Sequence, residues 1–231
     1  MQVKIVACTS PWIDHPREPG EEYARELSAE EFIAYAARVS NPDNQANTET
    51  APKLLKYLVN HKHWSPFEMV HVVMEVRTTR DISRQLLRHH FSFQEFSQRY
   101  AEVTEFIFRE CRFQDAKNRQ NSIPVDRSDP NQMSIAQQWL NIQFKAEEQA
   151  KEAYQWALDH GIAKEVARVV LPEGLTVSTL YVAGTIRNWI HYCQVRVDPS
   201  TQKEHRELAK ACWDALTEWD FQSIKGLVDA K

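Results

Sequence analysis

The sequence predicts an α+β protein, with an irregular α/β arrangement as the alternative. Residues 133–160 have strong helical character and end at Gly161, a residue well suited to the position after a helix. Residues 69–77 alternate apolar with other residues, as in a strand with one buried face. The few predicted strands do not alternate regularly with helices, as βαβ units would require. No repeat or clear boundary divides the chain, so one domain over residues 1–231 is expected.

The first elements follow from alternation and capping signals. Residues 2–8 alternate polar with apolar side chains and predict a strand. Ser28 and Glu31 form a capping box, which predicts a helix over 29–40 that stops before Asn41-Pro42. A second helix is predicted at 50–61.

The strongest predicted strand leads directly into a short polar helix. In residues 69–77, Val70, Val72, Met74 and Val76 share one face, while His71 and Glu75 lie on the other. Thr78 and Asp81 form a second capping box, so a helix is expected to begin there and to bring Gln85 and Arg88 onto one side.

The second half of the chain is predicted to be mainly helical. A strand is expected at 103–108, and the polar segment 114–131 with its two prolines is expected to be a mobile loop. Thr201 with Glu204 predicts the start of the last helix. The other predicted elements are helices at 133–160, 163–171, 185–194 and 203–219 and a strand at 175–182.

Composition is ordinary for a soluble globular protein and excludes several classes. Of the 231 residues 42% are hydrophobic and 26% are charged, and the formal net charge is −4. A pI of about 6.1 does not favour binding to a nucleic-acid polymer. No apolar stretch approaches the roughly 18 residues of a membrane span. A cytoplasmic location without membrane attachment is therefore expected.

Arginines are concentrated within residues 80–99. These are Arg80, Arg84, Arg88 and Arg99. The planar guanidinium matches a phosphate group with two hydrogen bonds, so a phosphorylated small molecule fits this cluster better than a polymer does. The alternative is that these arginines are surface or interface residues paired with Glu75, Asp81 and Glu95. Both interpretations hold together if the site lies between subunits.

Metal and nucleophile chemistry receive little support. The histidines at 61, 63, 71, 89 and 90 could be considered zinc ligands, but no HExxH or matched Cys/His spacing accompanies them. No metal is therefore expected. The cysteines at 8, 111, 193 and 212 show no CxxC spacing and no reactive context, and there is no GxSxG turn.

Residues 84–100 read RQLLRHHFSFQEFSQRY and resemble the signature RHRxxSxNxxSxRY, preceded by RQ, of the flavin-dependent thymidylate synthases. Four supporting segments follow the order of that family over most of the chain. They are HWSPFE at 63–68, EVARVVLP at 165–172, TIRNWIHYCQVRVD at 185–198 and TQKEH at 201–205. Five ordered segments make a chance match improbable.

This resemblance implies a fold of mixed helices around a small, largely antiparallel sheet. It also implies reductive methylation of dUMP to dTMP, with methylenetetrahydrofolate as one-carbon donor, FAD as redox cofactor and NADPH as reductant. The family resemblance further implies a homotetramer whose sites are shared between subunits. Such sharing would account for an arginine-rich surface that serves both as site and as interface.

The resemblance also implies roles for individual residues. Arg196 would be the catalytic residue that activates the uracil. The dUMP site would comprise Gln85, Leu86, Leu87, Arg88, Glu95, Phe96, Ser97, Gln98, Arg99, Arg168 and Arg196. The FAD site would comprise Ser65, Glu68, Arg88, His89, His90, Glu95, Thr185, Arg187 and His191, with Arg187 and His191 supplied by a neighbouring subunit.

Physical chemistry independently supports the role implied for Arg196. Uracil C5 is a weak nucleophile, and a guanidinium near N3 and O4 stabilises the anion that raises electron density at C5. Because arginine does not act as a base at ordinary pH, its contribution is electrostatic, and the redox chemistry belongs to the flavin.

The sequence departs from the family pattern around His90. RHHFS is one residue shorter than RHRxxS, and His90 stands where an arginine is usual. Met69 replaces a common histidine after PFE, and His191 replaces a usual asparagine. The alternatives are therefore a related flavoenzyme that methylates or hydroxymethylates another pyrimidine nucleotide, and a nucleotide-binding protein without turnover.

Overall fold

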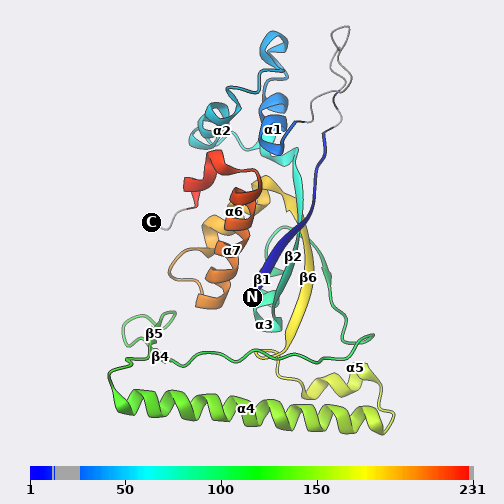
Figure 1. Cartoon of the computed structure of the whole chain (residues 1–231), viewed down its shortest axis with the longest axis vertical. Coiled ribbons are helices and arrows are strands. Elements are labelled where there is room, and N and C mark those ends of the chain that lie inside the picture. Colours follow the sequence, from blue (N-terminus) through cyan, green and yellow to red (C-terminus); the bar gives the residue numbers. More distant parts are fainter. Residues whose placement is uncertain (12, 14–26, 229–231) are drawn as a thin grey trace.

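The sheet is antiparallel throughout, and helices flank it. The computed structural model describes residues 1–11, 13 and 27–228. Four strands form one sheet in the order β1-β2-β6-β3 (Figure 1). They are β1 (Gln2–Cys8), β2 (His71–Thr79), β6 (Val177–Thr185) and β3 (Ser92–Glu95). The predicted α+β class with a small antiparallel sheet is confirmed.

Period-two alternation in β2 sets the two faces of the sheet. Val72, Met74 and Val76 are fully buried, as the pattern in residues 69–77 predicts. On the opposite face Glu75 is only half-buried and accepts a hydrogen bond from the Tyr181 hydroxyl of β6. Because a one-residue slip would exchange the two faces, this pattern fixes the register that pairs His71 with Thr185 at one end of β2 and Thr79 with Val177 at the other.

Four helices cover the apolar face of the sheet. They lie along one side of it in Figure 1: α1 (Ala29–Ala37), α2 (Ala51–Asn60), α6 (Ile186–Arg196) and α7 (Lys203–Trp219). Together with the central strands they form the main core, whose largest fully buried side chains include Trp189 and Tyr192. The short helix α3 (Arg80–Leu86) follows β2 directly and buries Ile82 and Leu86 in the same core.

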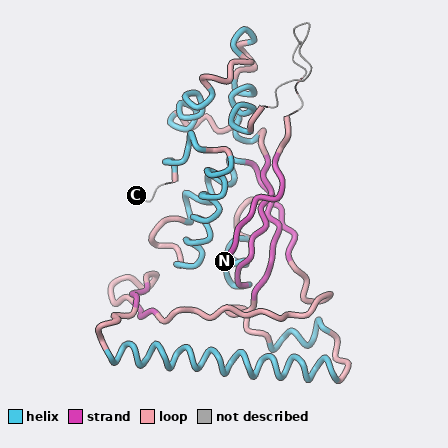
Figure 2. Tube along the Cα trace, viewed as in Figure 1, coloured by secondary structure: helices cyan, strands magenta, loops and turns pink. Residues whose placement is uncertain are grey.

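A separate layer lies at the foot of the molecule (Figures 1 and 2). The helix α4 (Pro130–Asp159) begins at Asp129, whose side chain accepts hydrogen bonds from the first two backbone N–H groups that follow Pro130. It is preceded by a two-stranded hairpin of β4 (Arg112–Gln114) and β5 (Ser122–Pro124), and it is followed by α5 (Lys164–Ala167). Large apolar side chains of α4 remain exposed, among them Trp139, Leu140, Ile142 and Phe144.

Short 3-10 helices complete the described chain. They are η1 (Pro42–Asn44), η2 (Ser65–Glu68), η3 (Arg168–Val170) and η4 (Gln222–Leu227). In the described part of the chain, no helix is both long and apolar enough to cross a membrane.

Several predicted boundaries are wrong, and each has a local cause. Residues 103–108 form only an isolated bridge, between Phe106 and Thr176, because their backbone pairing is limited to the hydrogen bonds from Val177 to Glu105 and from Ile107 to Leu175, just before β6 meets β3. The segment 114–131 is not a loop throughout, because it contains β5, which pairs with β4. Residues 92–95, which carried no strand prediction, pair with β6 as β3.

Two capping predictions are also wrong. The N-cap of α3 is Thr79, since Thr78 still belongs to β2, and the Thr79 hydroxyl bonds Asp81 rather than a backbone N–H. The N-cap of α7 is Gln202 rather than Thr201, and no side chain caps this end. By contrast, the capping box of Ser28 and Glu31 at α1 is confirmed.

Candidate active site

A cavity of ≈ 830 Å³ opens between α6, η2 and the end of α2. Four of the residues that the resemblance places beside the flavin lie on its wall: Glu68, His90, Arg187 and His191. Arg187 and His191 were expected from a neighbouring subunit, but they line this cavity together with Glu68 and His90 of the same chain. Arg187 and His191 are one helical turn apart on α6, and the Arg187 guanidinium forms an ion pair with Glu68 of η2. The other lining residues include Trp64, Ile190 and Leu227, so the wall is both cationic and apolar.

The start of α6 fixes which of its faces meets this cavity. Thr185 caps the helix through a reciprocal capping box with Asn188. Trp189 is fully buried, and its indole N–H donates to the Val72 carbonyl at 3.2 Å. With Trp189 held in the core, Arg187 and His191 are directed to the exposed side of α6.

A second polar cluster lies where α3, α6 and α7 meet. Arg196 donates from Nε to Nε2 of His89 at 2.7 Å. The amide of Gln85 donates to Oε1 of Gln202 at 2.8 Å, and its own oxygen lies 3.2 Å from Nδ1 of the fully buried His205. The rings of Tyr192, His89 and His205 form a triangle: the Tyr192 centroid lies 4.8 Å from His89 and 5.7 Å from His205, and the two histidine centroids are 6.2 Å apart.

Both histidines of this cluster are held neutral. Burial, reinforced by the positive charge of Arg196 and by His191, lowers the pKa of His89 to about 4. Burial, reinforced by Arg196, His89 and Arg88, lowers the pKa of His205 to about 3. In the contact between Arg196 and His89, the guanidinium therefore carries the positive charge and donates the hydrogen bond, and the neutral imidazole accepts it.

Glu95, at the end of β3, forms ion pairs with two arginines of α3. Its Oε1 accepts from the hydroxyls of Ser83 at 3.2 Å and Ser178 at 2.9 Å and lies 3.4 Å from Arg80, while its Oε2 lies 3.3 Å from Arg84. The alternative pairing of the arginines with Glu95 is thus confirmed for Arg80 and Arg84. Asp81 instead pairs with Arg109, at 2.7 Å.

A second cavity, of ≈ 450 Å³, adjoins this arginine group. Its wall holds Arg80, Arg84 and Arg168 together with the acids Glu165 and Glu173 and the side chain of Gln98. Gln98 is only 4% exposed, and its Nε2 has no hydrogen-bond partner. A buried donor without a partner beside three guanidiniums is suited to an anionic ligand.

Comparison with known proteins identifies the family. The family described as thymidylate synthase complementing protein matches residues 24–220. The chain is 46% identical over 231 residues, 99% of each protein, to the probable flavin-dependent thymidylate synthase of Paramecium bursaria Chlorella virus 1. It is 47% identical over 213 residues to the flavin-dependent thymidylate synthase of Synechocystis, covering 91% of this chain and 92% of that protein. The chain belongs to the flavin-dependent thymidylate synthase family.

A solved structure agrees with this family assignment. The UMP/dUMP methylase PolB from Streptomyces cacaoi, bound with 5-Br dUMP, superposes with a TM-score of 0.77 at 25% identity. The match covers 98% of this chain and 93% of PolB. The resemblance carried by residues 84–100 is confirmed, and the chain is an enzyme of the flavin-dependent thymidylate synthase family.

The residues assigned from the family motifs fall into three places in one chain. Glu68, His90, Arg187 and His191 line the larger cavity. Gln85, His89 and Arg196 belong to the polar cluster at α7. Gln98 and Arg168 line the smaller cavity, beside which Arg99 pairs with Glu165 at 3.1 Å. Among the described residues, no hydrogen bond or ion pair joins the second group to the third.

The other assigned residues occupy varied environments. Leu86 is fully buried in the main core, and Phe96 is 36% exposed. Ser65 and Arg88 are exposed, whereas Leu87 and Ser97 are half-buried. Thr185 uses its hydroxyl to cap α6, and both oxygens of Glu95 are engaged by protein donors.

Sequence reasoning missed Gln202, His205 and Tyr192 as members of the polar cluster. The segment TQKEH contains the first two, but its place in the family order and its capping pattern of Thr201 and Glu204 single out neither side chain. One sequence feature could have indicated His205: it lies in the first turn of an amphipathic helix. The structure buries this position completely. No group of three or more His, Cys, Asp or Glu residues suited to a metal ion occurs in the described ranges.

Proposed function

We propose that this chain converts dUMP to dTMP by reductive methylation, with FAD as redox cofactor, NADPH as reductant and methylenetetrahydrofolate as one-carbon donor. The observation that carries the proposal is the convergence of Glu68, His90, Arg187 and His191 on one cavity of ≈ 830 Å³. That volume lies within the range of about 300 to 1,000 Å³ usual for cofactor sites.

The donor set of this cavity fits a flavin dinucleotide. Arg187 and the two histidines supply donors for a pyrophosphate, and Trp64, Ile190 and Leu227 supply apolar surface for flat rings. Bound there, the flavin would supply the redox chemistry. The protein's part is to bind and orient it.

Arg196 is proposed to activate the nucleotide. Its Nε is held by His89, so its two terminal nitrogens remain oriented as a planar pair for the edge of the base. A fixed positive charge beside N3 and O4 lowers the energy of the uracil anion and increases electron density at C5. Because His89 and His205 are neutral, neither imidazole adds a positive charge beside the guanidinium of Arg196.

The nucleotide phosphate is proposed to bind at the smaller cavity, through Arg168, Arg99 and Gln98. The Nε2 of Gln98, which is buried without a hydrogen-bond partner, supports this assignment. Arg196 and Gln85 belong to a different group in the same chain, and this separation supports a nucleotide site completed by a second copy. A homotetramer with shared sites would provide it.

The exposed apolar residues of α4 support the same oligomeric arrangement. Trp139, Leu140, Ile142 and Phe144 are each more than 40% exposed, a concentration typical of surfaces that another protein covers. In Figure 1 this helix lies along the foot of the molecule, apart from the main core. A second copy of the chain is the proposed partner.

A second candidate is methylation of a different pyrimidine nucleotide. Two observations favour keeping it: the missing residue beside His90, and the similarity to PolB, which is described as a UMP/dUMP methylase. Hydroxymethylation of the base would use the same binding groups.

The test is the anaerobic visible spectrum of FAD-supplemented protein during addition of NADPH, with and without dUMP. Bleaching of the flavin band that dUMP accelerates, followed by dTMP formation with methylenetetrahydrofolate, is the expected result. Bleaching that responds to UMP or dCMP instead would favour the second candidate. Nucleotide binding without any flavin reduction would contradict both.

A further inference from the structure

The N-cap and the first turn of α7 hold the nitrogen and the oxygen of the Gln85 amide. Gln85 donates from Nε2 to Gln202 at 2.8 Å, and its Oε1 lies 3.2 Å from Nδ1 of His205. These contacts join residues 117 and 120 positions apart in the sequence. Gln85 itself is one of the residues assigned above to the nucleotide.

The hydrogen-bond roles in this contact are determined by elimination. Since the Gln85 nitrogen donates to Gln202, the amide orientation is set and its oxygen faces His205 as an acceptor. His205 must then carry its single proton on Nδ1, because the ring is neutral at physiological pH. Its Nε2 is an acceptor, and it is buried without a partner.

This arrangement leaves Gln85 with a defined recognition capacity. A primary amide offers two N–H donors and two acceptor lone pairs. Gln202 takes one donor and His205 takes one lone pair, so one N–H and one lone pair remain in a fixed orientation. A pyrimidine or ribose edge that presents a neighbouring acceptor and donor can be read by such a pair.

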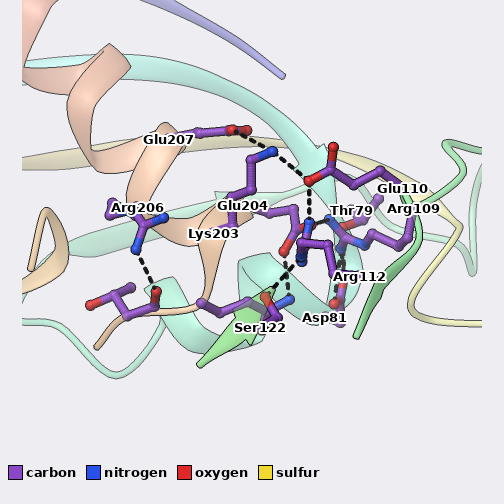
Figure 3. A network of polar contacts seen from close by, with 12 residues as sticks. Thr79, Asp81, Arg109, Glu110, Arg112, Ser122, Lys203, Glu204, Arg206 and Glu207 are labelled. Carbon is purple, nitrogen blue, oxygen red and sulfur yellow. Dashed lines mark hydrogen bonds and ion pairs between the residues drawn. The ribbon is translucent and has the colours of Figure 1, made fainter. Parts of the chain in front are cut away.

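A network of ion pairs keeps α7 in place relative to the helix that carries Gln85 (Figure 3). Glu204 of α7 bonds Arg112 at 2.7 Å and lies 3.8 Å from Arg109. The same Arg109 bonds both oxygens of Asp81, at 2.7 and 2.9 Å, in the first turn of α3. One guanidinium therefore links the two helices whose side chains meet at Gln85.

We propose that His205, assisted by Gln202, is a positioning residue that orients the Gln85 amide toward the pyrimidine nucleotide. The proposal rests on the proposed function, because it takes Gln85 as a nucleotide contact. In the described part of the chain, the buried Nδ1 of His205 lies against the Oε1 of Gln85 and not against a backbone carbonyl, so satisfying this N–H also constrains a side chain assigned to the nucleotide.

The test compares two substitutions at one buried position. Replacing histidine with asparagine (His205→Asn) keeps an N–H donor close to the position of Nδ1, whereas His205→Leu keeps volume and loses the donor. We expect His205→Leu to raise the dissociation constant for dUMP about tenfold, the worth of one well-placed hydrogen bond. We expect His205→Asn to stay within about threefold of wild type, and both variants to keep wild-type FAD content.

Titration calorimetry with dUMP gives the readout without turnover. Equal losses of dUMP affinity in His205→Leu and His205→Asn, or no loss of affinity in His205→Leu, would overturn the proposal. If His205→Leu does not fold, Gln202→Ala removes the exposed half of the same contact and should weaken dUMP binding in the same direction, so unchanged binding would overturn it. Wild-type protein that binds no pyrimidine nucleotide would instead overturn the proposed function on which this one rests.

Discussion

Arg196 donates a hydrogen bond from Nε to Nε2 of His89, across 2.7 Å and 107 positions of sequence. His89 is therefore the acceptor and carries its proton on Nδ1. Burial and the adjacent guanidinium lower the pKa of His89 to about 4, so the ring keeps this role throughout the physiological range. The contact fixes the plane of the guanidinium that is proposed to face the uracil.

Replacing Arg196 with lysine should abolish most turnover while the flavin stays bound. A lysine keeps the positive charge but cannot bond His89 through Nε and present a planar pair of donors at the same time. The expected loss in kcat is about 100-fold or more, as for other groups that stabilise a developing anion. FAD absorbance of the purified variant and steady-state dTMP formation give the two measurements.

The matched control is Arg206→Lys, at a half-buried position of α7 where the guanidinium bonds the Pro199 carbonyl. This variant should keep wild-type kcat. Unchanged turnover in Arg196→Lys would remove Arg196 from the proposed mechanism.

Replacing Arg99 with alanine should weaken dUMP binding by about tenfold, because a charged partner of the phosphate is lost. Its present partner, Glu165, is itself exposed, so the substitution should leave stability almost unchanged. Titration of dUMP into Arg99→Ala measures the effect, with the exposed Arg127→Ala as control. An affinity equal to that of the control would contradict the proposed place of the phosphate.

Glu95→Gln should destabilise the fold by about 3 kcal/mol, because it leaves the buried guanidinium of Arg80 with only the more distant and exposed Glu173, at 3.9 Å, as its anion. The side chains of Arg80 and Glu95 are only 10% and 17% exposed. Glu165→Gln, in a pair whose side chains are more than half exposed, should cost less than about 1 kcal/mol. Urea unfolding at one fixed protein concentration compares the two, and equal losses would show that Glu95 is not the centre of the arginine group.

Stability should fall as the pH drops below about 6.5, where unfolded histidine begins to bind protons. His205 is fully buried, and its folded pKa of about 3 means that only the unfolded state takes up this proton between those pH values. The linked slope is up to about 1.4 kcal/mol per pH unit for this one group. The free energy of unfolding, measured with urea from pH 7 to pH 4.5, should therefore change less steeply with pH in His205→Asn than in wild type. Equal slopes would refute the claim that His205 stays neutral in the folded state.

Replacing Ile142 with glutamate should reduce the assembly state. Ile142 and Phe144 of α4 are 57% and 55% exposed, so a charge at Ile142 would cost little in an isolated chain and much inside an interface. Light scattering coupled to size exclusion should report a smaller species than wild type. Lys151→Glu, a charge change further along the same helix, is the comparison, and an unchanged mass for Ile142→Glu would exclude this surface as the interface.

Local sequence patterns predicted most of the helices and strands. The alternation in residues 69–77 gave the buried face of β2, and the capping box of Ser28 and Glu31 gave the start of α1. These features depend on contacts within a few residues, which a sequence displays directly. β3 was missed because a strand of four residues is defined by its partner β6, which lies more than 80 residues away.

The sequence by itself determined the family, through five ordered segments, and the chemical types of the residues that carry its motifs. Only the tertiary structure decided how those residues are grouped: the guanidiniums of Arg80 and Arg84 around Glu95, Arg196 against His89, and Gln85 against His205. Each of these contacts joins side chains from separate elements. Packing of α3, α6 and α7 against one sheet brings them together, and no local spacing encodes that arrangement.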